Sequence, residues 1–199
     1  MFTGIIQAVG RVQAVKPAQG GVRIAIDCGA LPVDDVKIGD SIAADGVCLT
    51  VVALGGRRCE FDVSQETLSC TAGFKESAPV NLEKALRLAD RIDGHLVSGH
   101  VDGVGTIVSS AAVGDNRRLV IELPRELARY IARKGSVAVN GVSLTVNAVQ
   151  DTRFEINLIP HTLAVTALHA LAPGQQANIE VDMLARYAER LSEFKNASA

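Results

Sequence analysis

Short segments in which apolar and polar residues alternate occur throughout the chain and predict β-strands. The clearest are residues 21–28, 61–64, 96–108, 118–123 and 154–159. Alternation puts every second side chain on the same face of a strand, so each segment has one apolar face for a core. Turns containing glycine separate the segments, a pattern typical of small closed or nearly closed barrels.

Two segments have the spacing of helices. Residues 124–135 start at Pro124 and end at Gly135, residue types common at the first and last positions of helices. From Asp182 onward, apolar residues recur at intervals of three and four, which predicts a helix with an apolar stripe of Leu184, Tyr187, Leu191 and Phe194. This stripe fits packing against the chain's own barrel, the commoner arrangement, or association between copies.

A repeat with a period of 143 − 48 = 95 residues covers nearly the whole chain. GDSIAADGVCLTV (39–51) matches KGSVAVNGVSLTV (134–146), so Cys48 corresponds to Ser143. Each copy contains a strong hairpin signal, Asp45-Gly46 or Asn140-Gly141, between alternating segments. We therefore expect an all-β chain of two similar barrels that meet near residue 95, followed by a helix.

Composition excludes several classes of protein. The 199 residues carry 20 basic and 22 acidic side chains, a net charge of −2 that provides no general attraction for nucleic acid. No apolar run reaches the roughly 18 residues that cross a bilayer, and the N-terminus does not resemble a secretory signal. We expect a cytoplasmic protein that binds neither nucleic acid nor membranes.

Four cysteines and four histidines are the obvious candidate metal ligands. The cysteines form no CxxC pair, and without an export signal we interpret them as free thiols. His95 and His100 are five positions apart, which on a strand places them on opposite faces. The sequence therefore predicts no metal site.

Polar residues recur at matched positions after each hairpin turn. Cys48 and Thr50 share one strand face, and Ser143 and Thr145 share the equivalent face in the second copy. A solvated strand face explains one such pair, but its recurrence favours a functional role. No charged base stands beside either pair in the sequence, so a Ser-His-Asp hydrolase is not indicated.

The two copies differ at residues that transfer protons. His100 stands opposite Ile5, and His161 stands opposite Glu66. Although a lone histidine is more often structural, these differences indicate two similar pockets with unequal duties. Asp182 is a further difference, and we expect it to cap the C-terminal helix.

The start MFTGII, the pair GVCLTV and GVSLTV, the junction GHLVSGHVDG, and LIPHTL with NIEVD resemble the riboflavin synthases, a family with two lumazine-binding repeats. The resemblance covers about residues 1–190. It implies two tandem six-stranded Greek-key barrels, residues 1–95 and 96–182, and an oligomerisation helix with its tail, 183–199. It also implies a homotrimer whose active site lies between the first barrel of one chain and the second barrel of its neighbour, and an association with lumazine synthase.

The reaction implied by this resemblance is the dismutation of two molecules of 6,7-dimethyl-8-ribityllumazine, with no cofactor or metal. One molecule donates a four-carbon unit to the other, giving riboflavin and 5-amino-6-(D-ribitylamino)uracil. The protons of the 7-methyl group are acidic because the ring delocalises the anion, so a neutral histidine or hydroxyl suffices as the base. The residues that match catalytic positions of the family are Phe2, Ser41, Cys48, His100, Ser143 and Thr145.

Substrate contacts carry over from both copies. In the first barrel they are Gly4, Ile5, Ile6, Cys48, Leu49, Thr50, Asp62, Val63, Ser64, Gln65, Glu66 and Thr67. In the second they are Gly99, His100, Val101, Lys134, Ser143, Leu144, Thr145, Asn157, Leu158, Ile159, Pro160, His161 and Thr162. Main-chain groups of such segments read the edge of the ring, and hydroxyls and carboxylates hold the ribityl chain.

Two alternatives belong to other classes. A non-catalytic lumazine- or flavin-binding antenna protein would have the same two repeats, with a degraded second site and a monomeric state. The presence of Cys48, His100, Ser143 and the C-terminal stripe favours the enzyme. An FAD-dependent reductase barrel would need an Arg-x-Tyr-Ser motif, which the sequence lacks.

Overall fold

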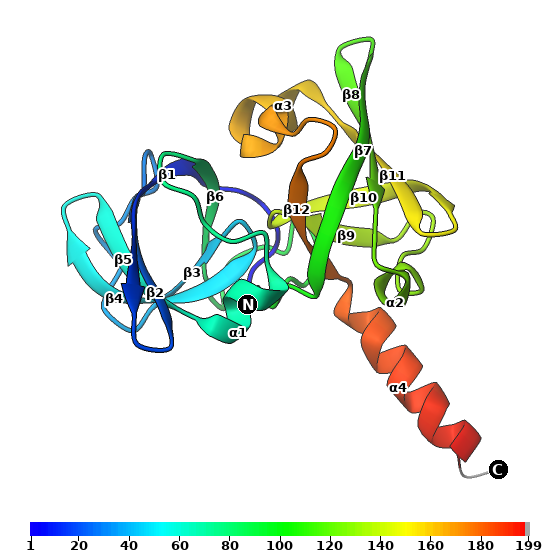
Figure 1. The fold of residues 1–199 in the computed structure, drawn as a ribbon, viewed down its shortest axis with the longest axis horizontal. Coiled ribbons are helices and arrows are strands. Elements are labelled where there is room, and N and C mark those ends of the chain that lie inside the picture. The colour runs from blue at the N-terminus through cyan, green and yellow to red at the C-terminus, as the bar shows by residue number, and fades with distance from the viewer. Residues whose placement is uncertain (198–199) are drawn as a thin grey trace.

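The computed structural model describes residues 1–197 and contains two closed barrels of six antiparallel strands each, followed by a helix (Figure 1). This confirms the all-β fold predicted from the sequence. The first barrel consists of β1 (Ala8–Ala18), β2 (Gly21–Asp27), β3 (Ser41–Ala44), β4 (Val47–Gly55), β5 (Arg58–Ser64) and β6 (Pro79–Lys84). The second consists of β7 (Gly103–Val113), β8 (Asn116–Glu122), β9 (Ser136–Val139), β10 (Val142–Gln150), β11 (Arg153–Leu158) and β12 (Gln176–Val181).

Both barrels have the same topology. The strands follow one another around the first barrel as β1-β2-β5-β4-β3-β6, and equivalent strands around the second as β7-β8-β11-β10-β9-β12. Alternate side chains fill each interior, with Phe61 (0% exposed) in the first and Phe154 (2% exposed) in the second. Closure pairs every strand on both sides, so neither barrel has a free sheet edge.

The predicted hairpins form at both matched turns. Asp45 and Gly46 have φ of 46° and 79°, and Asn140 and Gly141 have φ of 45° and 77°. Positive φ at both central residues is the requirement of a type I′ turn, which Asp-Gly and Asn-Gly meet. The two turns also touch, since a Cβ added to Gly46 would lie 2.8 Å from the backbone nitrogen of Gly141.

The helices agree only partly with the prediction. The helix expected over residues 124–135 is limited to α2 (Arg125–Ala128). Leu127 within it and Ile131 beyond it both belong to the core of the second barrel. Two six-residue helices, α1 (Gln65–Cys70) and α3 (Pro160–Val165), and a short 3₁₀ turn, η1 (Ala167–Ala170), were not predicted. The strand expected over 96–108 begins only at Gly103.

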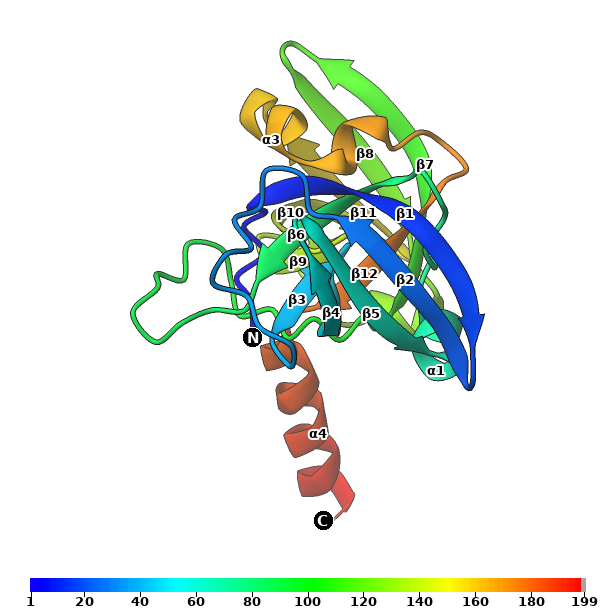
Figure 2. The same ribbon diagram turned by 90° about the vertical axis from the view of Figure 1, so that its left-hand side faces the viewer.

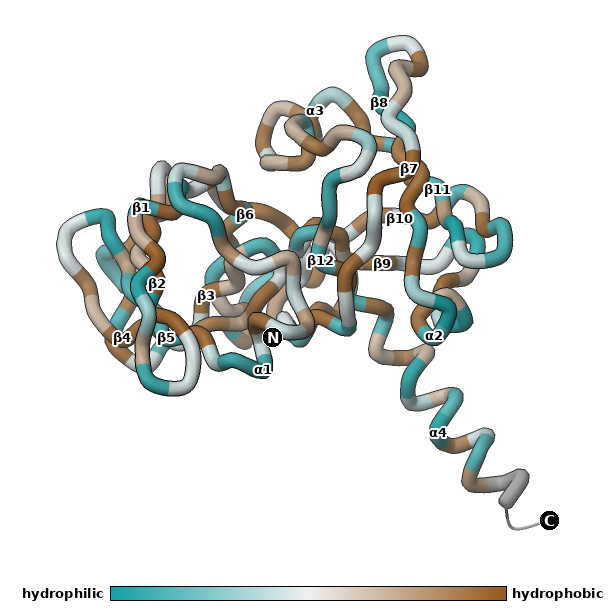
Figure 3. The backbone as a smooth tube through the Cα atoms, viewed as in Figure 1, coloured by the Kyte–Doolittle hydropathy of each residue, from teal (hydrophilic) through white to brown (hydrophobic). Residues whose placement is uncertain are grey.

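The C-terminal helix α4 (Met183–Ala197) forms as predicted. It projects away from both barrels (Figures 1 and 2), and hydrophobic and hydrophilic residues alternate along it (Figure 3). Leu184, Tyr187, Leu191 and Phe194 are 67%, 67%, 72% and 68% exposed. The stripe is therefore mostly exposed to solvent. No helix within residues 1–197 is long and apolar enough to cross a membrane.

Candidate functional site

The segments that precede β1 and β7 each cross to the other barrel. The amide of Cys48 on β4 donates to the carbonyl of Gly99 (2.8 Å), and the amide of Ser143 on β10 donates to the carbonyl of Gly4 (2.8 Å). Phe2 and Val97 form an antiparallel bridge where the two segments pass each other. In Figure 1 the N-terminus accordingly lies between the barrels.

This exchange corrects the expected grouping of the site residues. Residues 4–6 were predicted to serve the first barrel and residues 99–101 the second. In the structure, Ile6 packs against the core of the second barrel and Val101 against the core of the first. The sequence reasoning had grouped each segment with the barrel that it precedes in the sequence, whereas each packs against the other barrel.

The first barrel carries a cavity of about 250 Å3 that combines both sources of residues. Cys48 comes from β4, Glu66 and Thr67 from α1, and His100 from the exchanged segment; the complete lining is Val47, Cys48, Glu66, Thr67, Cys70, Thr71, Gly99, His100 and Val101. Ser64 positions the helix, since its hydroxyl accepts a hydrogen bond from the amide of Thr67 (3.1 Å). The structure thus brings together a thiol, an imidazole, a carboxylate and a hydroxyl around one cavity.

The equivalent place on the second barrel has a different polar centre. The hydroxyl oxygen of Ser143 lies 2.7 Å from Nδ1 of His95, a hydrogen bond with no counterpart at Cys48 among the described residues. Burial lowers the pKa of His95, and the charge of Asp182 opposes this change. The imidazole is therefore neutral near pH 7. His95 carries no sequence signal for this role, because 48 residues separate it from Ser143.

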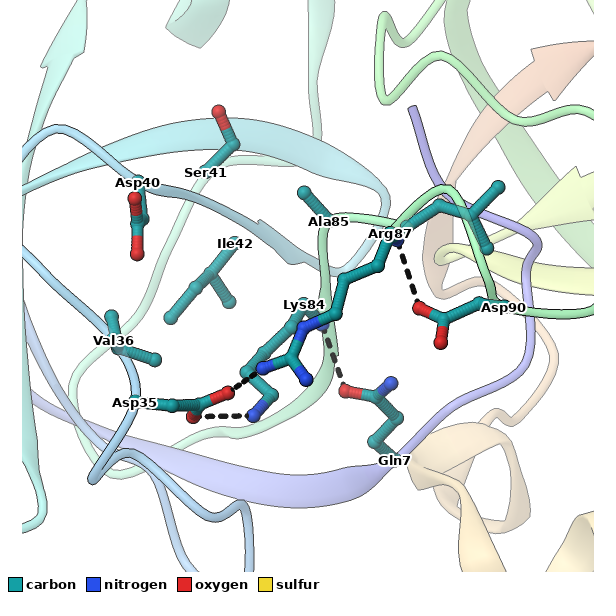
Figure 4. Close-up of a pocket in the computed structure, with 11 residues that line it drawn as sticks. Gln7, Asp35, Val36, Asp40, Ser41, Ile42, Lys84, Ala85, Arg87 and Asp90 are labelled. Carbon is teal, nitrogen blue, oxygen red and sulfur yellow. Dashed lines mark hydrogen bonds and ion pairs between the residues drawn. The ribbon is translucent and has the colours of Figure 1, made fainter.

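Ser41 lies in a separate polar cavity of about 510 Å3 (Figure 4). Asp35 lies at its other side and forms ion pairs with Lys84 (2.7 Å) and with Arg87. The hydrogen bond from Lys84 lowers the pKa of Asp35. Ser41 pairs with Thr50 on the β3–β4 ladder, two positions along from the pair of Ala43 with Cys48. Ser41, Thr50 and Cys48 therefore share the outward face of this ladder.

Several predicted site residues have buried side chains. Leu49, Val63, Leu144 and Leu158 are at most 9% exposed and belong to the barrel cores, so any ligand contact has to come from their main chain. Phe2 is fully buried (0% exposed) between the barrels.

Other predicted site residues are exposed or partly exposed. Asp62 forms an ion pair with Arg23 (2.8 Å). Lys134 has a φ of 66°, and its counterpart in the first barrel, Gly39, also has a positive φ, of 96°. Residues 159–162 form the start of α3, and Thr145 is exposed on β10.

The comparisons with known proteins agree with this architecture. The model of the lumazine binding domain matches residues 3–85 and 98–182. Riboflavin synthase from Photobacterium phosphoreum is 46% identical over 96% of this chain and 88% of its own length. Riboflavin synthase from Brucella abortus is 45% identical over 98% of this chain and 100% of its own length. The chain belongs to the riboflavin synthase family.

Solved structures share the fold of this riboflavin synthase family member. LumP complexed with riboflavin superposes with a TM-score of 0.82 at 26% identity, covering 91% of this chain and 99% of LumP. LumP complexed with 6,7-dimethyl-8-(1'-D-ribityl) lumazine superposes with a TM-score of 0.80 at 25% identity over the same shares.

Proposed function

We propose that this enzyme of the riboflavin synthase family converts two molecules of 6,7-dimethyl-8-ribityllumazine into riboflavin and 5-amino-6-(D-ribitylamino)uracil. The observation that carries the proposal is the pair of equivalent composite sites, one at Cys48 and one at Ser143, each built from a barrel and an exchanged segment. Two copies of one heterocycle need two similar sites. Transfer of the four-carbon unit between them is balanced without an external oxidant or reductant.

The polar groups at the two sites fit this chemistry. Loss of a 7-methyl proton needs only a mild base, and imidazoles are present as His100 at the first site and His95 beside Ser143 at the second. A nucleophile that adds to the ring of the other molecule is available as the thiol of Cys48, the hydroxyl of Ser41 or water. Holding the two rings face to face supplies much of the rate, because it replaces a bimolecular encounter.

We propose that the two reacting molecules are bound by different chains. Each chain presents Cys48, Thr50 and Ser41 on the outward face of β3 and β4, where a second barrel from a neighbour can bring its own substrate. The exposed stripe on α4 supports a homotrimer held by these helices.

We also propose a cytoplasmic location, an association with lumazine synthase and a division of the chain into three parts. The four free cysteines support a cytoplasmic location, where thiols stay reduced. An association with lumazine synthase would place the enzyme beside the source of its substrate, and co-sedimentation of the two proteins tests it. The division into residues 1–95, 96–182 and 183–199 is compatible with barrels that end at Lys84 and Val181.

A non-catalytic lumazine-binding protein is the second candidate, because both solved relatives named above are LumP. Incubation of the purified full chain with the lumazine distinguishes the two. We expect riboflavin absorbance to appear, with two lumazines consumed for each riboflavin and each pyrimidinedione formed. Tight binding of the lumazine without any change in its spectrum over hours would establish the binding protein and overturn the proposed enzyme.

A further inference from the structure

Two buried glutamates hold the exchanged segments. Glu180 on β12 is 4% exposed, and its Oε1 accepts hydrogen bonds from the amide (2.6 Å) and the hydroxyl (2.7 Å) of Ser98. Its Oε2 accepts from the amide of Gly99 (2.9 Å). The hydroxyl of Ser98 in turn accepts from the amide of His100 (3.3 Å). One carboxylate therefore orders three consecutive residues of the segment.

Glu83 on β6 repeats this arrangement in the first barrel. It is also 4% exposed, and it accepts hydrogen bonds from the amide (2.7 Å) and hydroxyl (2.8 Å) of Thr3 and from the amide of Gly4 (3.0 Å). Burial raises the pKa of both glutamates, and the hydrogen bonds from the segments oppose that change. A buried carboxylate is costly unless such donors satisfy it.

Each held segment reaches the site of the opposite barrel. The segment held by Glu180 of the second barrel contacts Cys48 and lines the cavity of the first barrel with Gly99, His100 and Val101. The segment held by Glu83 of the first barrel contacts Ser143 of the second. We propose that Glu180 and Glu83 are positioning residues that act across the chain, each shaping the substrate site of the opposite barrel. This inference rests on the proposed function for its catalytic meaning, but its geometry holds without it.

Glu180→Gln and Glu83→Gln form a matched pair of variants. In each, a glutamine amide replaces one acceptor oxygen, so one N–H group of the segment faces another donor. Both residues are equally buried and bind equivalent donors, so each loss should affect its own barrel to a similar extent. The variants differ in the segment that is released, and therefore in the site that is disturbed.

The rate at which iodoacetamide alkylates Cys48, followed by mass spectrometry of the full chain, tests this directly. We expect Glu180→Gln to raise the rate at Cys48 about fivefold or more, because the segment that covers it loosens. Glu83→Gln should raise it at most about twofold, because the Thr3 segment reaches Cys48 only through Phe2. The buried Cys28 and Cys59 report general opening and should stay unreactive in both. Equal acceleration at Cys48 in both variants, no change in either, or reaction of Cys28 and Cys59 would overturn the proposal.

If a glutamine variant does not fold, a second pair of variants with smaller changes replaces it. Ser98→Ala and Thr3→Ala each remove one donor and leave the carboxylate in place, and the same difference at Cys48 is expected at a smaller size. Riboflavin protection of Cys48 is a separate readout, and we expect Ser98→Ala to require several-fold more riboflavin and Thr3→Ala to require the wild-type amount. If the wild-type protein shows no protection at all, the proposed function fails, while the alkylation rates still decide the positioning role.

Discussion

The amide nitrogen of Cys48 lies 2.8 Å from the carbonyl oxygen of Gly99, so a residue that precedes the second barrel closes the cavity of the first. Gly99 has a φ of 79°, and a Cβ placed there would lie 2.7 Å from Cβ of Cys48 and 2.8 Å from the ring of Phe2. Only glycine meets both demands. The fully buried Phe2 is therefore best understood as a support for this close approach.

Substitution of Gly99 by alanine should damage the first site more than the left-handed backbone alone explains. Gly20 has the same φ of 79° with nothing within 4 Å of an added Cβ, so Gly20→Ala measures the backbone cost alone, about 1 kcal/mol. We expect Gly99→Ala to cost roughly 2–4 kcal/mol in the free energy of unfolding and to abolish turnover. Equal effects of the two variants in urea denaturation would contradict the close packing.

His100 and Ser143 should both contribute to proton transfer, from different sites of one chain. We expect His100→Ala and Ser143→Ala each to lower kcat, and the double variant to lower it by roughly a hundredfold, with a smaller change in KM. His169→Gln is the control, because His169 is exposed on η1 and its Nδ1 lies 2.7 Å from the carbonyl of Thr166. Roughly full turnover in the double variant would exclude both residues from catalysis.

Asp45 should make the stability of the protein depend on pH. Burial raises its pKa to about 7, against an unfolded value near 3.8, and its carboxylate accepts a hydrogen bond from the amide of Asn81. The folded state therefore favours the protonated form, so the stability that Asp45 contributes is complete below pH 4. It is lost as the pH rises from about 4 to about 7.

The second barrel has Asn140 at the equivalent turn, where it accepts a hydrogen bond from Asn178 in the same way. Asp45→Asn should therefore raise the free energy of unfolding at pH 8 by about 1–2 kcal/mol, since Asp45 retains some exposure to solvent, and should flatten the profile between pH 4 and 7. Thermal unfolding across this range measures it, with Asp115→Asn in an exposed turn as the control. An unchanged profile would show that Asp45 is ionised in the folded state throughout.

The stripe on α4 should hold the proposed trimer together. Replacing Tyr187 and Leu191, which are 67% and 72% exposed, by serine removes apolar area that only other copies can cover. Sedimentation should shift from a trimer to the 20.9 kDa monomer, and turnover should be lost with it. Ser192→Asn, next to the stripe on the same helix, should leave the trimer intact. A doubly substituted protein that stays trimeric would place the interface elsewhere.

The repeat and the alternating patterns predicted the two barrels well, because strand periodicity and the Asp45-Gly46 and Asn140-Gly141 turns act locally in the sequence. The spacing of Leu184 to Phe194 predicted α4 for the same reason. The exchange of segments was missed, since residues 4–6 and 99–101 have no periodic pattern that identifies the barrel they contact. Similarly, α1 and α3 are too short at six residues for a helical period to show.

The sequence predicted which residues belong to the candidate site, but not how these residues contact one another. The family resemblance named Cys48, Thr67 and His100, which line one cavity. It did not find His95, whose bond to Ser143 exists only because the segment after β6 returns to the second barrel. Contacts of this kind depend on tertiary packing, and a single sequence carries no local signal for them.

A site shared between chains is tested most directly with two variants, each of which blocks the site of one barrel. Thr67 lines the cavity of the first barrel, and Thr162 is its counterpart on α3, so Thr67→Trp and Thr162→Trp each block one site. Each variant alone should be inactive. In a trimer that contains both, one of the three interfaces joins an intact first barrel to an intact second barrel of its neighbour.

Turnover of such mixed trimers, purified after co-expression of the two variants with different tags, is the decisive measurement. A site between chains predicts riboflavin formation at about one third of the wild-type rate per trimer. Mixed trimers as inactive as either parent would show that both lumazines react within a single chain, and would contradict the account.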